Sequence, residues 1–263
     1  MNSIIRIIPV LFIKNGHIVR SQNFFEHQVI GNVVNQCARY NSWNIDELIY
    51  IDISRKKKYD SLRDDHRIKS LKNIKEIVQE ISNVCSAPLT FGGGIQTLDD
   101  MKVRMYNGAD KIILNTLLFD NEKLVEKAAM TFGSQAIVAS IDYKEVDKEI
   151  FFFKDHGKKK VRFKKKELLK YLENIGVGEL FFHSISRDGK AKGFDIDFCE
   201  DLRDLTRLPI ILCGGAGTEF DFVDVIKNTQ INAVAAGNFF HFKELSYVNL
   251  KKILKKSGCN VRI

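Results

Sequence analysis

This chain of 263 residues has few prolines, no paired cysteines and no long apolar run. With only three prolines and 44% hydrophobic residues, it can bury a large core as one domain or two, as expected of a soluble globular protein. Its five cysteines show no CxxC spacing and no histidine cluster, so we expect free, mostly buried thiols and no metal. No stretch approaches the roughly 20 apolar residues of a membrane span, and MNSIIRIIPV lacks the features of a signal peptide. We therefore expect one domain over residues 1–263, located in the cytoplasm.

Positive charge is in excess, with a formal net charge of +8. Lysines cluster in RKKKYD (residues 55–60) and GKKKVRFKKK (residues 157–166), and both runs are predicted to be excursions between regular elements. The runs carry no recognisable nucleic-acid motif and only Tyr59 or Phe163 among their basic residues, which argues against a nucleic-acid partner. A solvated surface or a phosphorylated small molecule accounts for the charge instead.

Apolar runs alternate with amphipathic ones along the whole chain. The apolar runs are continuous rather than alternating, as strands buried on both faces of a parallel sheet require. Because eight strands alternate with helical segments, the pattern predicts a (β/α)8 TIM barrel. A doubly wound open sheet is the alternative, and the absence of a GxGxxG turn counts against it. The predicted strands are residues 4–13, 47–53, 88–94, 111–116, 136–143, 179–185, 209–215 and 232–238, and helical patterns include residues 71–82, 99–108, 121–133 and 165–176.

An internal repeat supports the barrel. ELIYIDISR aligns without gaps on ELFFHSISR, PLTFGGGIQT on PIILCGGAGT, and IIPVLFIK on IVASIDYK. Three matches in the same order indicate two duplicated half-barrels. The alignment places Phe12 and Asp142 at equivalent strand ends, where active sites of such barrels lie. Asp142 is a candidate acid or base, although a helix cap or turn would also explain it, and Phe12 could simply plug the barrel mouth.

Glycine clusters follow two repeated strands. Their uncovered N–H groups can approach a phosphate just before a helix begins, although glycine can also relieve crowding there. Two such sites suggest a ligand with a phosphate at each end, or descent from an enzyme that bound one. The first predicted site comprises Gly93, Gly94, Asn115 and Thr116, and the second comprises Asp188, Gly189, Gly214, Gly215, Gly237 and Asn238.

Ordered sequence blocks carry a family resemblance over essentially the full length. They are RIIPVLFIKNG, DELIYIDI, FGGGI, GADKIILNT, TFGSQAIVASID, SISRDG, PIILCGGAG, FFHF and GCNVRI. In these blocks the chain resembles the cyclase subunit of imidazole glycerol phosphate synthase, the HisF type. The resemblance implies a heterodimer with a HisH-like glutaminase, whose ammonia crosses the barrel to cleave and cyclise a doubly phosphorylated ribonucleotide. It implies no cofactor.

The resemblance also assigns residue roles. It places an ammonia gate at Arg6, Glu47, Lys111 and Glu179, near the amino ends of their strands, although a purely stabilising ring would explain the same charges. It assigns one catalytic carboxylate to Asp142 and puts the other at Phe12, which cannot transfer a proton. Arg20 keeps a basic charge after the first strand. Hydroxyl residues around the second phosphate are replaced by Cys213, His183 and Gly237.

Three functions are compatible with these differences from the family's pattern of site residues. We place first an ammonia-accepting synthase that acts on an anionic sugar or sugar nucleotide in surface-polysaccharide synthesis. The alternative is the histidine-pathway cyclase itself, which forms imidazole glycerol phosphate and aminoimidazole carboxamide ribotide, with its acid supplied by Lys14, Arg20, His183 or water. The third is a non-catalytic barrel that activates a glutaminase.

Overall fold

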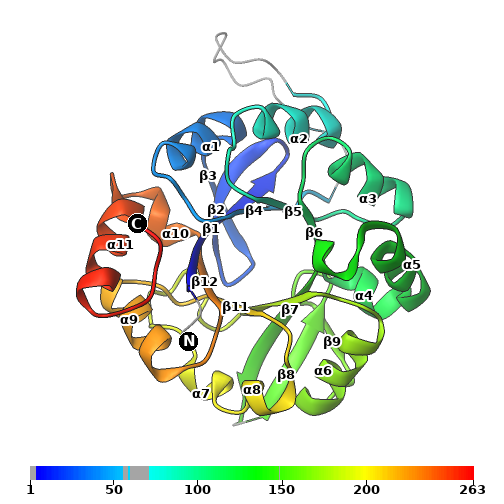
Figure 1. The fold of residues 1–263 in the computed structure, drawn as a ribbon. Helices are drawn as coiled ribbons and strands as arrows, with labels where there is room; N and C mark the ends of the chain where they lie inside the picture. The colour runs from blue at the N-terminus through cyan, green and yellow to red at the C-terminus, as the bar shows by residue number, and fades with distance from the viewer. Residues whose placement is uncertain (1–3, 56–58, 60–70, 148) are drawn as a thin grey trace.

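Eight parallel strands form a closed ring in the described part of the chain, and helices surround it (Figure 1). The computed structural model describes residues 4–55, 59, 71–147 and 149–263. Strand β10 pairs with β7 as well as with β11, which closes the sheet. The predicted (β/α)8 barrel is therefore confirmed. Its strands are β1 (Arg6–Lys14), β4 (Leu48–Asp52), β5 (Leu89–Gly92), β6 (Lys111–Leu114), β7 (Ile137–Val146), β10 (Glu179–Ser184), β11 (Ile210–Cys213) and β12 (Ala233–Ala236).

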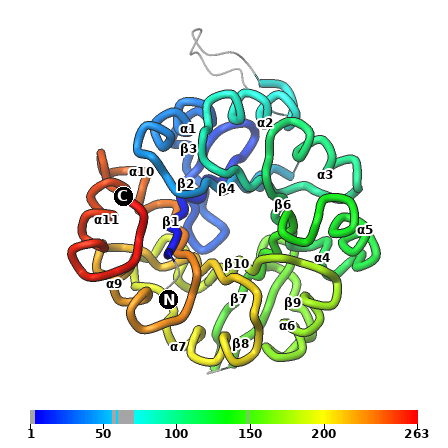
Figure 2. Tube along the Cα trace, in the orientation of Figure 1, coloured from blue at the N-terminus to red at the C-terminus, as the bar shows by residue number. Residues whose placement is uncertain are grey.

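The chain runs around the ring in sequence order, as the colour gradient in Figure 2 shows. Each segment predicted as a strand overlaps one of the barrel strands. Segments matched in the repeat form strands four places apart, such as β1 and β7. Both of these strands are followed by antiparallel additions, which are β2 (His17–Gln22) and β3 (Glu26–Asn32) after β1, and β8 (Glu149–Lys154) and β9 (Lys159–Val161) after β7. This symmetry agrees with the predicted duplication.

The second basic run, residues 157–166, is not wholly an irregular excursion, so that prediction is wrong in part. Its centre forms β9, which pairs with β8 because Val161 is buried on one face of the added sheet while its lysine neighbours are exposed. The end of the run begins helix α6. Residues 56–58 and 60 of the first basic run lie outside the described residues.

Several helices begin at polar caps. Thr97 caps α3, since its hydroxyl accepts from Asp100 N at 3.1 Å and Asp100 Oδ2 accepts from Thr97 N at 3.0 Å. Thr218 and Asp221 form the same capping box on α9, at the matched position of the repeat. The helices are α1 (Val33–Asn41), α2 (Ile74–Ser82), α3 (Leu98–Met105), α4 (Thr116–Asp120), α5 (Glu122–Phe132), α6 (Lys165–Asn174), α7 (Ile196–Cys199), α8 (Leu202–Leu205), α9 (Glu219–Asn228), α10 (Asn238–His241), α11 (Ser246–Lys256) and the 3₁₀ turn η1 (Ser134–Ala136). No helix among these described segments is long and apolar enough to cross a membrane.

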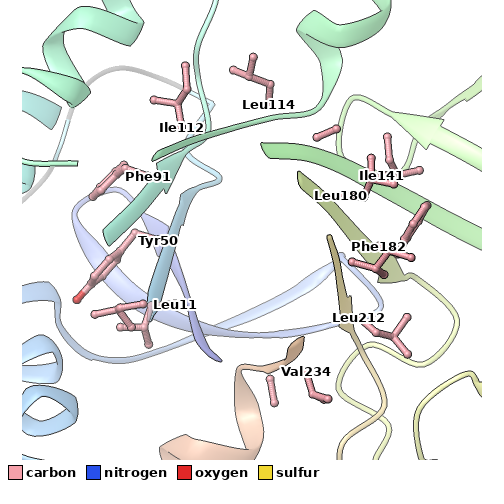
Figure 3. Close-up of a cluster of buried hydrophobic side chains, with 14 of the residues drawn as sticks. Leu11, Tyr50, Phe91, Ile112, Leu114, Ile141, Leu180, Phe182, Leu212 and Val234 are labelled. Carbon is pink, nitrogen blue, oxygen red and sulfur yellow. The ribbon is translucent and has the colours of Figure 1, made fainter. Parts of the chain in front are cut away.

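The strands bury both faces, which explains their continuous apolar sequences. Side chains such as Leu11, Tyr50 and Phe91 leave the ring on its outer side and join the large cluster beneath the helices (Figure 3). Their neighbours in sequence point inward, where Val10, Ile49 and others form a second cluster inside the barrel. Successive residues of a strand point to opposite faces, so each strand contributes to both layers. The inner layer separates the two ends of the barrel, at which the predicted site residues lie.

Candidate active site

The four predicted gate residues meet at the amino end of the barrel. Arg6 donates to Glu47 at 2.6 Å and to Glu179 at 2.5 Å. Lys111 Nζ lies 3.0 Å from Glu47 Oε1 and 2.8 Å from Glu179 Oε2. Each cation thus bridges both carboxylates, and the ring of four charges closes across the barrel floor. Thr90 Oγ1 adds a hydrogen bond to Glu47 at 3.1 Å.

Burial and ion pairing act in opposite directions on this ring. Burial lowers the pKa of Lys111, but Glu47 and Glu179 outweigh it and leave the pKa above its ordinary value. Arg6 follows the same pattern. Both cations therefore stay charged at neutral pH. Since Glu47 and Glu179 are almost fully buried, removal of either cation would leave their negative charge only partly neutralised.

Asp142 lies at the opposite end, on the inner face of β7, and is 7% exposed. Asn115 donates from Nδ2 to Asp142 Oδ2 at 3.3 Å and to Ser140 O at 2.9 Å. Burial raises the pKa of Asp142 to about 7, although His183 on the neighbouring strand opposes the shift. The carboxyl group can therefore exchange a proton near neutral pH.

Phe12 and His183 form an aromatic wall beside Asp142. Their rings stack with centroids 5.9 Å apart and planes 11° apart, and Phe24 covers His183 with centroids 4.6 Å apart. Phe12 belongs to the inner apolar cluster and is 9% exposed. The expectation that Phe12 plugs the mouth agrees with this position. His183 Nε2 lies 3.5 Å from Asp188 Oδ1, so the wall contains a charged pair at its edge.

The residues of the second predicted phosphate site share one cavity at the mouth. The cavity measures about 230 Å³ and is lined by Asp188, Gly189, Gly214, Gly215, Gly237 and Asn238, together with Phe12, His183 and Cys213. Backbone N–H groups of the glycines are the natural donors for an anion there. Lys243 adds a positive charge at the rim. A larger cavity of about 370 Å³ lies nearby, but none of the predicted site residues lines it.

The residues of the first predicted phosphate site do not line the 230 Å³ cavity. Gly94 has a positive φ of 62° and open space where a side chain would be. Asn115 is engaged with Asp142, and Thr116 Oγ1 accepts from Asp155 N at 3.1 Å. Arg20 lies on β2, paired with Gln28 of β3, and does not line the 230 Å³ cavity. The structure thus brings together the second set of residues more closely than the first.

Crowding explains part of the glycine pattern. A side chain at Gly93 would meet Asp52 O at 1.9 Å, and one at Gly215 would meet Gly193 O at 2.0 Å. Both positions also have positive φ, which other residues adopt at a cost. The crowding alternative considered from the sequence therefore holds at these two glycines, and it is compatible with exposed N–H groups.

The sequence analysis missed two residues that complete the mouth. Ser21 donates to Asp188 Oδ2 at 2.8 Å, and Phe24 N donates to the same oxygen at 3.2 Å. Asn238 Nδ2 holds the Ser21 carbonyl at 2.8 Å. The β2–β3 hairpin is thereby fastened to the loop after β10 and to the start of α10. No local signal identifies Ser21, since its partner is 167 residues away.

Comparison with known proteins extends along this whole barrel. The model of the histidine biosynthesis protein family matches residues 6–246. The chain belongs to this family. Similar proteins include the imidazole glycerol phosphate synthase subunit HisF of Sulfolobus acidocaldarius, 36% identical over 258 residues and covering 98% of each chain. HisF of Thermotoga sp. is 35% identical over 98% of this chain and 97% of its own, and HisF of Leuconostoc mesenteroides is 35% identical over 98% of each.

Membership of the histidine biosynthesis protein family confirms the resemblance noted in the sequence. The roles of Asp142, of the four-charge ring and of the glycine-lined cavity stay predictions. The order of the functions proposed from the sequence changes, however. The relatives named above are subunits of imidazole glycerol phosphate synthase, which favours the histidine-pathway alternative over the surface-sugar synthase that we placed first.

Proposed function

We propose that this chain is the cyclase subunit of an imidazole glycerol phosphate synthase. It would use ammonia to convert a doubly phosphorylated ribonucleotide into imidazole glycerol phosphate and aminoimidazole carboxamide ribotide. The observation that carries the proposal is that one barrel has a closed ring of charges at its amino end and the ionisable Asp142 at its carboxyl end. The full-length similarity to HisF subunits supports it.

The partner in this proposal is a HisH-like glutaminase that docks at the amino end of the barrel. Ammonia released by the partner would enter the barrel through the ring of Arg6, Glu47, Lys111 and Glu179. Because each cation holds two carboxylates, one broken pair would still leave each glutamate with a cation. Such a ring can therefore open at one side at a lower cost than an isolated buried pair.

The substrate would lie across the carboxyl end of the barrel. One phosphate would bind in the cavity that Gly214, Gly215 and Gly237 line, where N–H groups and Lys243 favour an anion. The other would bind near Gly94, which leaves open space beside its backbone. Asp142 lies between these two regions of the mouth, on β7.

Asp142 would transfer the protons of the cyclisation. With a pKa of about 7, it accepts a proton readily in its ionised form and returns it in its neutral form. A rate that depends on ionised Asp142 rises with pH until about pH 7 and then levels off. Phe12 supplies no second proton-transfer group, and His183, whose ring stacks on Phe12, is an ionisable side chain beside that position.

The proposed reaction is tested with added ammonium salts, which bypass the glutaminase. Purified protein should convert the doubly phosphorylated ribonucleotide into imidazole glycerol phosphate, measured by chromatography and mass spectrometry of the product. The matched control is a HisF relative that has a carboxylate at the position of Phe12. If the relative turns over and this chain forms no product above the uncatalysed background, the cyclase proposal is overturned and the surface-sugar and non-catalytic alternatives return.

Removal of one ring cation should uncouple the two subunits. Among the described residues, Lys111→Met leaves Arg6 as the cation that pairs with both glutamates. We therefore expect the glutamine-dependent rate to fall by about 10-fold while the ammonium-dependent rate changes little. The ratio of product formed to glutamate released is the measurement. Lys102→Met is the matched control, since Lys102 pairs with the exposed Asp99 at 3.5 Å and takes no part in the ring. An unchanged ratio in Lys111→Met would show that the ring is purely structural.

A further inference from the structure

Three side chains that line the cavity proposed above for one substrate phosphate suggest a further chemistry there. Cys213 is the last residue of β11, and His183 is its register partner on the neighbouring β10. Both residues face the barrel interior and line the same 230 Å³ cavity, with Asp188 beside them. A thiol, an imidazole and a carboxylate therefore meet around one space large enough for a small molecule.

The imidazole of His183 is held from several sides. Asp188 Oδ1 lies 3.5 Å from Nε2, while the other Asp188 oxygen is fixed by Ser21 and by Phe24 N. The rings of Phe12 and Phe24 lie against the imidazole. Such support fixes both the position of the ring and the side on which it carries a proton.

The charges around His183 favour its protonated form. Burial lowers the pKa of His183, but Cys213 and Asp188 raise it well above its ordinary value. A second carboxyl group near His183 is that of Asp142, because the two residues are register partners on β10 and β7. A cation beside a cysteine stabilises the thiolate, which is the nucleophilic form.

The backbone after Cys213 suits an anionic ligand. Gly214 and Gly215 follow at once with φ values of 101° and 105°, and both line the cavity together with Gly217 and Gly237. Their N–H groups lie next to the sulfur in the chain, where they could hold the charge of a bound electrophile. Lys243 at the rim also favours an anionic ligand.

We infer that Cys213, His183 and Asp188 form an activated thiol that bonds covalently to a small electrophile carrying a phosphate or carboxylate group. In this pair the proton of the Cys213 thiol resides on His183, and Asp188 orients the imidazolium. The Sγ electron pair forms the new bond to the electrophilic carbon, and the leaving group departs with the electron pair of the bond that breaks. This bond formation goes beyond the cyclase reaction proposed for Asp142, although the thiol shares the cavity proposed for one substrate phosphate.

Alkylation with iodoacetate tests the inference on the whole protein. The carboxylate of iodoacetate mimics the anionic ligand, and iodide is the leaving group. At about pH 6, where an ordinary thiol is mostly protonated, Cys213 should react about 10-fold faster in the natural protein than in His183→Gln. Peptide mapping by mass spectrometry locates the modified cysteine. Millimolar inorganic phosphate should slow the reaction by occupying the glycine-lined cavity.

The other cysteines and a pH series provide the controls. Cys85 is half-buried and outside the cavity, so neither phosphate nor His183→Gln should alter its alkylation. In the natural protein the rate at Cys213 should change little between about pH 6 and 8, whereas an ordinary thiol reacts about tenfold faster for each pH unit. This measurement needs no variant. A Cys213 rate that rises tenfold per pH unit, or that stays the same in a folded His183→Gln or Asp188→Asn protein, would overturn the inference.

Discussion

Asp142→Asn should lower the ammonium-dependent rate by about 10²-fold or more while the barrel stays folded. The substitution removes the proton-transfer group with almost no change in side-chain volume. Its new amide oxygen can still accept the hydrogen bond that Asn115 donates to Asp142 Oδ2. The measurement is the steady-state rate of imidazole glycerol phosphate formation, with circular dichroism as the check on folding. A near-normal rate would reduce Asp142 to a turn residue, which was the alternative considered from the sequence.

Compared with the natural protein, the Asp142→Asn variant should gain more stability at high pH than at low pH. The folded pKa of Asp142 is about 7, whereas an unfolded aspartate has a pKa of about 3.9. The folded protein therefore holds this proton more tightly, and the contribution of Asp142 to stability is lost as the pH rises from about 4 to about 7. Asparagine does not ionise and avoids that loss. Urea unfolding at about pH 5 and about pH 8 measures the effect, and an equal difference between variant and natural protein at both pH values would contradict it.

The second large effect concerns Phe12. In the absence of a carboxylate there, the natural protein should cyclise its substrate at least about 10²-fold more slowly than a HisF relative that has one. Phe12→Asp should recover part of that deficit, because the new carboxylate would replace a ring that stacks on His183 and would gain a cationic neighbour. Recovery should be incomplete, since Cys213, His183 and Gly237 still differ from the hydroxyl residues expected around the second phosphate. Product formation from added ammonium salts is the measurement.

Phe12→Leu is the matched control for that experiment. Both substitutions remove the aromatic ring of Phe12 from the inner cluster. Only the aspartate adds a proton-transfer group. A higher rate in Phe12→Asp but not in Phe12→Leu identifies the carboxylate as the cause. Natural-protein turnover equal to that of a carboxylate-bearing relative would show that the acid lies elsewhere in the mouth.

The sequence by itself determined the barrel, its repeat and the ends at which charge is placed. These features follow from local patterns, because a strand buried on both faces must be apolar throughout and a charge at its first residue marks the rim. Arg6, Lys111 and Glu179 each begin a strand, and Glu47 directly precedes one. Their common location at the barrel floor was therefore predictable once the strands were recognised.

Only the tertiary structure decided which side chains meet at the mouth. Phe12 and His183 come from different half-barrels, and their stacking depends on closure of the ring. Ser21 reaches Asp188 because the β2–β3 turn folds against the loop after β10, a contact that no local pattern encodes. The raised pKa of Asp142 has the same origin, since desolvation depends on everything packed around a carboxyl group rather than on its sequence neighbours. Hydrophobic periodicity fixes which face of a strand is buried, whereas distances across the barrel are fixed only when all eight strands have closed.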